Sequence, residues 1–579
     1  MHYVHALVLS LFLYCFTALP SHAQNSLTHG HYDKNYFRSP LDIPLKLAGT
    51  FGELRTNHFH AGIDCKTGGQ ENLNIYAVAD GYVSRIKISP TGYGNALYID
   101  HPNGYTSVYA HLKKFTGAIG QWVENYQYQN QTFAFDAQIP IGELQVTKGL
   151  VVAKSGNTGS SGGPHLHFEI RDTFTEEALN PLLFGLQVTD NVKPSLRQLA
   201  IYPFERPDDR HSKAKIYPIK YEGGKYKTTT NHIKVNTSRV GIGLKTYDKQ
   251  TGIHHLNGIY SLKMLDNGNS VYAFAMERIG FEESRYINCH VDYTHKANGG
   301  GLMQRCFLEP GNRLNIYRDL FNRGVIDLSD GLLHKITFEV QDIAGNISTL
   351  SFMLQYDPNL PAPQPEEEAY SNFFYYAADN SFNHENLTMF MPYGSLYNDL
   401  PFSYSASPST TKGVYSDYYQ LHNSKTPVHK YFDVAIRPTN LPNYLRDKAL
   451  IAYKTRSGKT KSAGGVWEGD YLKGQAKEFG TFFITVDTIA PTLKPVTITN
   501  GKNMSKNQTI TLTINDNLSG IKSYDGYIDG QWILMSYDKK TARLRYWFDE
   551  RASKGKHEFT LVVTDESNNT KTFKANFVR

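Results

Sequence analysis

Long apolar runs and clusters of basic residues are both scarce in this sequence of 579 residues. Beyond the N-terminus, no apolar run approaches the ~20 residues that a helix needs to cross a bilayer, so we expect no transmembrane segment. The formal net charge is only +6, and no basic stripe suggests a nucleic-acid partner. This excess of positive charge suits association with an acidic cell envelope but does not require it.

Cysteine is scarce as well, with four in the chain. Cys15 is a poor lipoprotein cysteine, because the bulky Tyr14 precedes it. Cys289 and Cys306 could pair in an oxidising compartment, although the sequence does not show that their geometry permits a bond. Cys65 directly follows a candidate metal ligand, and strand alternation predicts that it points away from the metal as a buried thiol.

The N-terminus carries the one pronounced apolar stretch. Residues 6–19 are followed by Ser21-His-Ala23, which is typical of a secretory signal with an A-x-A-like cleavage site, although no Lys or Arg precedes the apolar stretch. We interpret residues 1–23 as a signal peptide. We therefore expect an exported protein in the periplasm or cell envelope, with an extracellular location as the alternative.

A histidine pair behind a glycine-rich turn is the first sign of chemistry. His165-Leu-His167 follows the glycine-rich residues 156–164 and opens an alternating segment. In a strand, residues two apart point to the same side, so His165, His167 and Glu169 share one face while the residues between them face the core. Glu169 either orients a ligand imidazole or is a solvated carboxylate. The alternative for the whole segment is a polar strand face with incidental histidines.

Two further elements give this pair more weight. His60-Ala-Gly-Ile-Asp64 places a histidine and a carboxylate around a glycine that lets the backbone bend, and an alternating strand over residues 105–112 contains His111 near its end. Each element is weak alone, but three within about 110 residues make coincidence the poorer explanation. Together they supply ligands for one zinc ion. A zinc site with three protein ligands and an open fourth position is catalytic by type, because water there can become a nucleophile near neutral pH.

Seven short motifs follow one another in order along residues 60–169, namely His60–Asp64, Ile75–Gly81, Gly92–Asn95, Ile99–His101, Tyr109–Leu112, Ser155–Gly159 and Gly163–Glu169. With this string, the stretch from about residue 50 to 175 resembles the M23 family of zinc metallopeptidases, the lysostaphin-like or LytM-type peptidoglycan endopeptidases. The resemblance covers only about a fifth of the chain. It implies an antiparallel, lysostaphin-like domain in which His60, Asp64 and His167 bind one zinc ion per chain. It also implies that His111 and His165 are the catalytic pair.

Two features depart from the pattern of this family. His58 stands where many relatives carry an arginine, and we interpret it as a bystander beside His60. Residues 124–146 are a probable insertion, in which Tyr126, Tyr128, Phe133 and Phe135 alternate with other residues. This spacing predicts an extra hairpin or flap beside the cleft, which would narrow the choice of substrate or cover the site. A decorated loop is the alternative.

The rest of the chain reads as β-rich modules, so the expected fold class is mainly β. A chain of this length should hold several domains. After the signal peptide we expect, in order, an N-terminal arm (24–49), the M23-like peptidase domain (50–185), a β-sandwich (186–356), a Pro/Glu-rich linker (357–369), a β-rich domain (370–486) that resembles nothing we can name, and an immunoglobulin-like domain (487–579). Asp565-Glu-Ser-Asn-Asn569 loosely echoes Asp342-Ile-Ala-Gly-Asn346, which is weak indication of a repeat.

The sequence therefore predicts a secreted zinc metalloendopeptidase that hydrolyses peptide bonds in peptidoglycan stems or cross-links. The competing hypothesis is a non-catalytic envelope protein, because some relatives of this fold have lost their zinc ligands and activate other cell-wall hydrolases. The complete set of histidines and Asp64 argues against this alternative. We expect peptidoglycan as a partner, and the β-sandwich domains could contact an envelope protein. A third hypothesis, a protease of protein substrates, differs only in the substrate.

Overall fold

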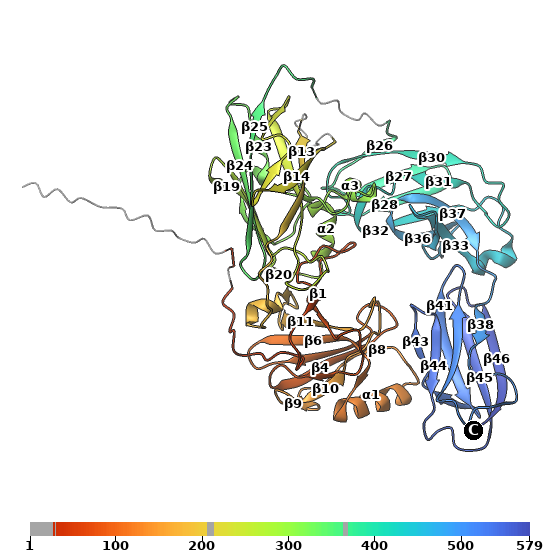
Figure 1. The fold of residues 1–579 in the computed structure, drawn as a ribbon. Helices are drawn as coiled ribbons and strands as arrows, with labels where there is room; N and C mark the ends of the chain where they lie inside the picture. Colours follow the sequence, from red (N-terminus) through yellow and green to blue (C-terminus); the bar gives the residue numbers. More distant parts are fainter. Residues whose placement is uncertain (1–26, 29, 205–212, 363–368) are drawn as a thin grey trace, which may run out of the picture.

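The computed structural model describes residues 27–28, 30–204, 213–362 and 369–579. The predicted signal peptide, residues 1–23, lies outside these described residues. The described chain is mainly β, as predicted, and forms four units that follow one another around a ring (Figure 1). Within the described ranges, no helix is both long and apolar enough to cross a membrane.

The first unit contains β1 (Leu47–Gly49), β2 (Ile63–Lys66), β3 (Asn74–Tyr76), β4 (Gly81–Ile88), β5 (Asn95–Asp100), β6 (Tyr105–Leu112), β7 (Lys114–Phe115), α1 (Gly117–Gln129), β8 (Phe135–Gln138), β9 (Gln145–Val146), β10 (Val151–Lys154), β11 (His165–Asp172), β12 (Ala178–Leu179) and a 3-10 turn, η1 (Pro181–Phe184). Its main sheet is antiparallel with the order β1-β2-β11-β6-β5-β4-β8, and β3, β10 and β7 form a second, smaller sheet.

The central position of β11 brings the three sequence elements together. β11 lies between β2 and β6, so that His167 pairs with Asp64 on one side and with Ala110 on the other. Leu166, Phe168 and Ile170 are fully buried in the core, as the alternation predicts. Motifs that are about a hundred residues apart in the sequence thus become neighbours across two strand pairs.

The predicted hairpin over residues 124–146 is wrong in its first half, which is helical. α1 buries Ile119, Val123 and Gln127, a spacing of four that belongs to a helix and not to a strand. The ring of Tyr126 stacks on that of Trp122, with 5.1 Å between the ring centroids. Only the second half contains strands, with β8 and β9 both pairing with β4.

The second unit contains β13 (Ser195–Pro203), β14 (Lys215–Glu222), β15 (Lys225–Thr228), β16 (His232–Val235), β17 (Arg239–Tyr247), β18 (Ser261–Asp266), β19 (Asn269–Ala275), β20 (Arg278–Ile279), η2 (Ser284–Tyr286), α2 (Ile287–His290), α3 (Tyr293–Ala297), β21 (Gln304–Arg305), β22 (Tyr317–Leu320), η3 (Asn322–Gly324), β23 (Ile326–Asp327), β24 (His334–Gln341) and β25 (Ile347–Tyr356). All of its strands except β20 belong to one sheet.

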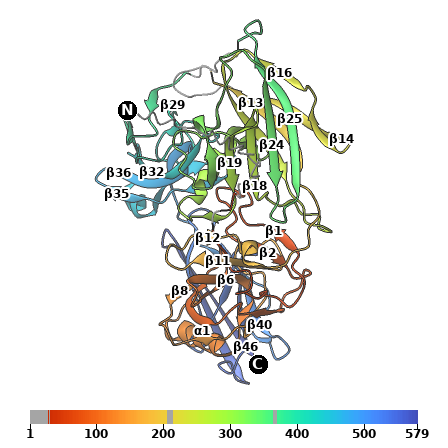
Figure 2. The ribbon, with the colours of Figure 1, turned by 90° about the vertical axis from the view of Figure 1, so that its left-hand side faces the viewer.

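The first and second units are joined by the pairing of one short strand and by a shared core. β20, although it follows β19 in the chain, pairs with β12 of the first unit. Phe51 and Phe59 of the first unit are buried in the same hydrophobic core as Leu262 and Phe338 of the second. Figure 2 shows the second unit directly above the first. The two units are therefore packed against one another and are not independent domains.

The third unit contains β26 (Asn372–Phe374), β27 (Asn380–His384), β28 (Leu387–Met391), β29 (Leu400–Phe402), β30 (Tyr404–Ser407), β31 (Tyr418–Leu421), β32 (Pro427–Ile436), η4 (Asn443–Lys448), β33 (Ala449–Lys454), β34 (Thr460–Ser462), β35 (Val466–Glu468), β36 (Tyr471–Glu478) and β37 (Gly480–Val486). Its two larger sheets, β27-β28-β32-β36-β35 and β30-β31-β37-β33-β34, enclose one core.

The fourth unit contains β38 (Thr492–Pro495), β39 (Lys502–Asn503), β40 (Thr509–Asn515), β41 (Ile521–Ile528), β42 (Gln531–Ile533), β43 (Ser536–Asp538), β44 (Arg543–Trp547), β45 (Lys556–Asp565) and β46 (Thr570–Val578). Two sheets, β38-β40-β44-β43 and β39-β46-β45-β41-β42, pack on a common core.

The fourth unit returns to the first and closes the ring (Figure 1). The guanidinium of Arg551 lies 3.7 Å from the centre of the Tyr128 ring on α1, and the Tyr128 hydroxyl donates to Asp549. Lys540 donates hydrogen bonds to the carbonyl oxygens of Asn157 and Ser161, in the glycine-rich turn before β11. The end of the chain thus contacts both α1 and the loop that carries His165.

The three cysteines among the described residues are free and buried. Cys289 and Cys306, which could have paired, form no disulfide. Their thiols lie near backbone carbonyl oxygens of Tyr286 and Gln304. Cys65 packs among apolar side chains of the first core, and burial raises the pKa of its thiol, as expected for an inert cysteine.

Candidate metal centre

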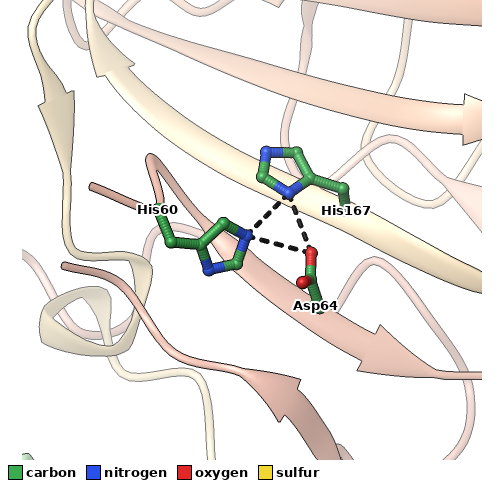
Figure 3. A group of neighbouring side chains, drawn as sticks. All are labelled: His60, Asp64 and His167. Atoms are coloured by element: carbon green, nitrogen blue, oxygen red, sulfur yellow. Dashed lines mark hydrogen bonds and ion pairs between the residues drawn. The ribbon is translucent and has the colours of Figure 1, made fainter. Parts of the chain in front are cut away.

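Three donor atoms from β2, the loop before it and β11 converge on one point (Figure 3). His60 Nε2 lies 3.0 Å from Asp64 Oδ1 and 3.0 Å from His167 Nδ1, and His167 Nδ1 lies 2.9 Å from Asp64 Oδ1. Donors on a tetrahedral zinc ion, with bonds of about 2.0–2.1 Å, are about 3.3 Å apart. The cluster is therefore slightly contracted relative to a filled site, and its nitrogen and oxygen donors suit zinc.

Hydrogen bonds at the opposite ring nitrogens orient both histidines. His60 Nδ1 donates to the backbone carbonyl of Thr50 at 2.8 Å, and His167 Nε2 donates to Glu169 Oε1 at 2.7 Å. Each bond occupies the nitrogen that faces away from the cluster, which leaves the lone pair of the other nitrogen directed at the cluster. The residues present thus match the tautomers that metal binding requires.

Glu169 is fully buried and is the hub of a second layer behind His167. Its carboxylate accepts from the Arg171 guanidinium at 2.7 Å and from the Tyr93 hydroxyl, whose ring stacks on His167 with centroids 5.2 Å apart. Burial raises the carboxyl pKa, but Arg171 and His167 outweigh it and lower the pKa of Glu169 to about 2. Glu169 is therefore not a solvated carboxylate, since it is buried and bonded to His167.

Asp64 is held as a carboxylate by its neighbours. Burial favours the neutral acid, yet His60 and the bonds from His165 and His167 keep the pKa of Asp64 well below its usual range. Its second oxygen, Oδ2, accepts from Arg55 at 2.8 Å, and Arg55 also bonds Glu53. One oxygen of Asp64 therefore faces the cluster while the other is fixed from behind.

His111 and His165 lie beside the cluster without joining it. Their ring centroids are 4.8 Å apart, and His165 Nε2 lies 3.4 Å from Asp64 Oδ1. His111 Nδ1 donates to the Thr158 carbonyl at 2.9 Å, and His165 Nδ1 donates to the Gly163 carbonyl at 2.8 Å. In His111 this leaves Nε2 with a free lone pair, as a proton acceptor needs, whereas Nε2 of His165 faces the Asp64 carboxylate.

The buried histidines have displaced pKa values. Burial lowers the pKa of His60, and burial together with the neighbouring imidazoles lowers the pKa of His111 to about 3. Burial has the same tendency at His167, but Asp64 and Glu169 outweigh it and raise its pKa to about 9. His167 is thus the imidazole that two carboxylates share, and a bound cation would take the place of its extra proton.

The structure brings all five predicted residues into one site. His58 is exposed and bonds only to the nearby Thr56 carbonyl, as expected of a bystander. Sequence reasoning missed Arg55, Tyr93 and Arg171 as supports of the cluster. Arg171 could have been found by extending the alternation of β11 by one step, whereas no pattern marks Arg55.

Two family matches divide the chain. Residues 58–128 match peptidase family M23, and residues 371–487 match the Zu5-like domain. The first match covers His60, Asp64 and His111. The second coincides with the β-rich domain expected over residues 370–486, for which no resemblance was apparent in the sequence. The chain thus carries an M23 peptidase domain followed by β-rich units.

Curated relatives are similar over the same region. A "DD-carboxypeptidase/endopeptidase Mpg" of Neisseria meningitidis is 33% identical over 133 residues, which is 23% of this chain and 24% of that protein. A "Murein hydrolase activator NlpD" of Escherichia coli is 32% identical over 139 residues, which is 24% of this chain and 29% of that protein. The chain therefore spans less than a third of the length of these relatives.

Among solved structures, the catalytic domain of lysostaphin from Staphylococcus simulans is 22% identical, covering 25% of this chain and 93% of that chain with a TM-score of 0.19. The strand order around β11 and the family match carry the assignment of the first unit.

Proposed function

We propose that this chain, with its M23 peptidase domain, is a zinc metalloendopeptidase that hydrolyses peptide bonds in the stems or cross-links of peptidoglycan. One observation carries the proposal: His60, Asp64 and His167 converge as a ligand set while His111 and His165 remain beside it, each held by a hydrogen bond from Nδ1 to a backbone carbonyl. A protein that had kept the fold only for binding would have no need of both groups. Relatives named DD-endopeptidase support the substrate class.

His60, Asp64 and His167 would hold the zinc ion. When bound, zinc supplies Lewis acidity that polarises a peptide carbonyl and lowers the pKa of water towards about 7. Glu169 and the Thr50 carbonyl keep the two ligand rings in place through their outer nitrogens. Arg55 holds Asp64 from the other side.

The remaining steps fall to the histidine pair. One imidazole accepts at Nε2 the proton that water loses as its oxygen bonds to the scissile carbon, and it later delivers this proton to the leaving amine as the C–N bond breaks. The other, 4.8 Å away between ring centroids, would stabilise the oxyanion as an imidazolium that donates from Nε2, since its Nδ1–H is already bonded to a backbone carbonyl. The carbonyls of Thr158 and Gly163 hold both rings in orientation through Nδ1.

The apolar N-terminus supports a proposal about location: the protein is exported to the periplasm or cell envelope, where peptidoglycan lies. The β-rich units would then hold the peptidase against its polymeric substrate or contact an envelope protein.

Digestion of purified peptidoglycan by the full chain tests the function, with released muropeptides resolved by mass. We expect cleavage that a chelator abolishes and zinc restores, and none from Asp64→Ala. The masses of the products identify the bond. A zinc-loaded protein that releases no product from peptidoglycan would overturn the proposal.

The similarity to NlpD favours one competing function, activation of another cell-wall hydrolase. Activation would not depend on the metal ligands. Adding a separate amidase to the same digestion distinguishes the two: an activator stimulates it equally well as wild type and as Asp64→Ala, whereas the proposed enzyme acts without it.

A further inference from the structure

We propose that Asp190, Asp248 and Asp342, in the second unit, form a binding site for a divalent cation of the calcium type. The three residues come from loops at one end of this unit: Asp190 precedes β13, Asp248 follows β17 and Asp342 follows β24. One carboxylate oxygen from each lies within 4.8 Å of the others. Asp248 is 5% exposed and Asp342 is 2% exposed.

Two buried oxygens beside this cluster have no hydrogen-bond partner. One is Oδ1 of Asp248, and the other is the amide oxygen of Asn257, which is itself only 2% exposed. Asn257 pairs with Asp248 across an isolated antiparallel bridge, which sets their side chains next to each other. Buried polar atoms are almost always satisfied, so two such oxygens side by side indicate a missing electron-pair acceptor.

No ion pair among the described residues compensates the charge of these aspartates. In the same part of the chain, no basic side chain contributes to the displaced pKa values of Asp248 and Asp342. Burial, together with the negative charges of Asp342 and Asp190, raises the pKa of Asp248 to about 7. Burial also raises the pKa of Asp342. Carboxylates held together in this way need either protons or a cation.

The donors are uniformly hard. They are carboxylate oxygens and one amide oxygen, without nitrogen or sulfur, and calcium takes six to eight oxygen ligands of these kinds in flexible geometry. Asp190 and Asp342 are fixed from behind: Asp190 Oδ1 accepts from the Val192 backbone at 3.0 Å, and the Asp342 carboxylate accepts from the backbone and side chain of Asn346. The oxygens are thus placed in advance.

The fourth unit builds the same arrangement from a matching sequence. Asp487, Asp516 and Asp565 meet the same distance criterion, and Asp516 Oδ1 also lacks a partner. The side-chain amide of Asn569 bonds Asp565 and the Asp487 carbonyl, as that of Asn346 bonds Asp342 and the Asp190 carbonyl. Both units share the motifs D-x-x-x-P, D-x-x-x-G and D-x-x-x-N at these positions. The same acidic arrangement in two units supports a shared role in binding a cation.

The cluster of the second unit lies against the first unit. Asp190, Asp248 and Asn257 line a cavity of about 120 Å³ together with Leu47 and Thr50. Gly258, next to Asn257, donates its N–H to the Thr50 hydroxyl at 3.1 Å. A bound cation would therefore fix a loop that packs against the first unit.

Calcium titration of the full chain tests the site. The protein is freed of divalent ions, reloaded with one equivalent of zinc and titrated with calcium chloride while thermal unfolding and binding heat are recorded. All variants carry Asp516→Asn, which removes the equivalent cluster. Asp248→Asn is the test variant, and Asp447→Asn, an exposed aspartate in η4, is the matched control.

We expect calcium to raise the unfolding temperature of the control by at least about 2 °C, and to bind Asp248→Asn at least tenfold more weakly. Without calcium, we expect the opposite order of unfolding temperatures. Asp248→Asn should then unfold at a higher temperature than the control, because it removes an uncompensated buried charge. This reversal separates loss of a site from misfolding. Equal calcium binding by both proteins, or no binding by the control, overturns the proposal.

Discussion

The peptidase cluster and the aspartate cluster of the second unit each gather three donors within a few ångströms, but they are completed in different ways. Around His60, Asp64 and His167, nearly every outward-facing atom is tied to a neighbour, from the Thr50 carbonyl to Glu169 and Arg55. Around Asp190, Asp248 and Asp342, two buried oxygens have no partner. Mixed nitrogen and oxygen donors suit zinc, and oxygen alone suits calcium. Both clusters bring donor atoms together, but they differ in the hydrogen bonds to the other atoms of the same side chains. These bonds determine how firmly each donor is held in place.

Substitution of a ligand should have the largest effect on metal binding. It should abolish binding in its own cluster and leave binding in the other cluster unchanged. In the Asp516→Asn background, which removes the equivalent cluster of the fourth unit, we expect Asp64→Ala to lose zinc and all measurable peptidase activity while it keeps calcium binding. Asp342→Ala in the same background should lose calcium binding and keep zinc and activity. Metal content by mass spectrometry, measured beside muropeptide release, checks this. Turnover by Asp64→Ala would sink the ligand assignment.

The histidine beside the zinc ligands should behave differently from the ligands themselves. We expect His165→Ala to retain one zinc per chain and to lose about 10²–10⁴-fold in kcat, because proton transfer by a positioned side chain contributes about that much. Zinc content and single-turnover cleavage are the measurements. Loss of zinc would mean that His165 and His167 have been interchanged.

The layer behind His167 should tune affinity for zinc. We expect Glu169→Gln to bind zinc about 10–100-fold more weakly, the usual effect of losing such a support, measured by competition with a chelating dye. Glu177→Gln, near the end of the same hairpin and away from the cluster, is the control. An unchanged zinc affinity would make Glu169 a purely structural carboxylate.

Thr50 contacts residues of both regions through different atoms. Its backbone carbonyl holds His60, and its hydroxyl bonds Gly258. We expect Thr50→Val to lower the free energy of unfolding by about 1–3 kcal/mol, because the Gly258 N–H loses its partner. Zinc affinity should not change, since the carbonyl remains. A parallel loss of zinc affinity would show that the two clusters are coupled through this residue.

The smallest effect should come from the contact that closes the ring. Lys540 bonds only backbone carbonyls of the turn before His165. We expect Lys540→Ala to change kcat/KM on peptidoglycan by no more than about fivefold, as for other solvent-exposed polar contacts. Lys539→Ala is the control. A change of several orders of magnitude would instead make the fourth unit a gate.

Much of the site could be predicted from the sequence because its residues lie in short motifs with strict periodicity. The alternation in β11 placed His165, His167 and Glu169 on one face, and the same rule extends to Arg171. The helix α1 was missed because aromatic residues two apart suggested a strand, whereas burial at Ile119, Val123 and Gln127 follows a helical spacing. Arg55 and the aspartate clusters were missed for other reasons: Arg55 lies in a loop without a periodic pattern, although its partners Glu53 and Asp64 are near it in the sequence. The aspartate clusters depend on contacts between loops that are distant in the sequence. The echo between Asp342–Asn346 and Asp565–Asn569 is one local trace of these clusters, and the shared D-x-x-x-P and D-x-x-x-G motifs are two more.

The shared core of the first two units limits how evolution or an experimenter can rearrange this protein. Phe51 and Phe59 are buried against apolar residues of the second unit, and β20 completes the sheet beside β12. A cut between them would expose an unpaired strand edge and two large aromatic rings to water, which favours aggregation. We therefore expect the first unit to be unstable when it is separated from the second.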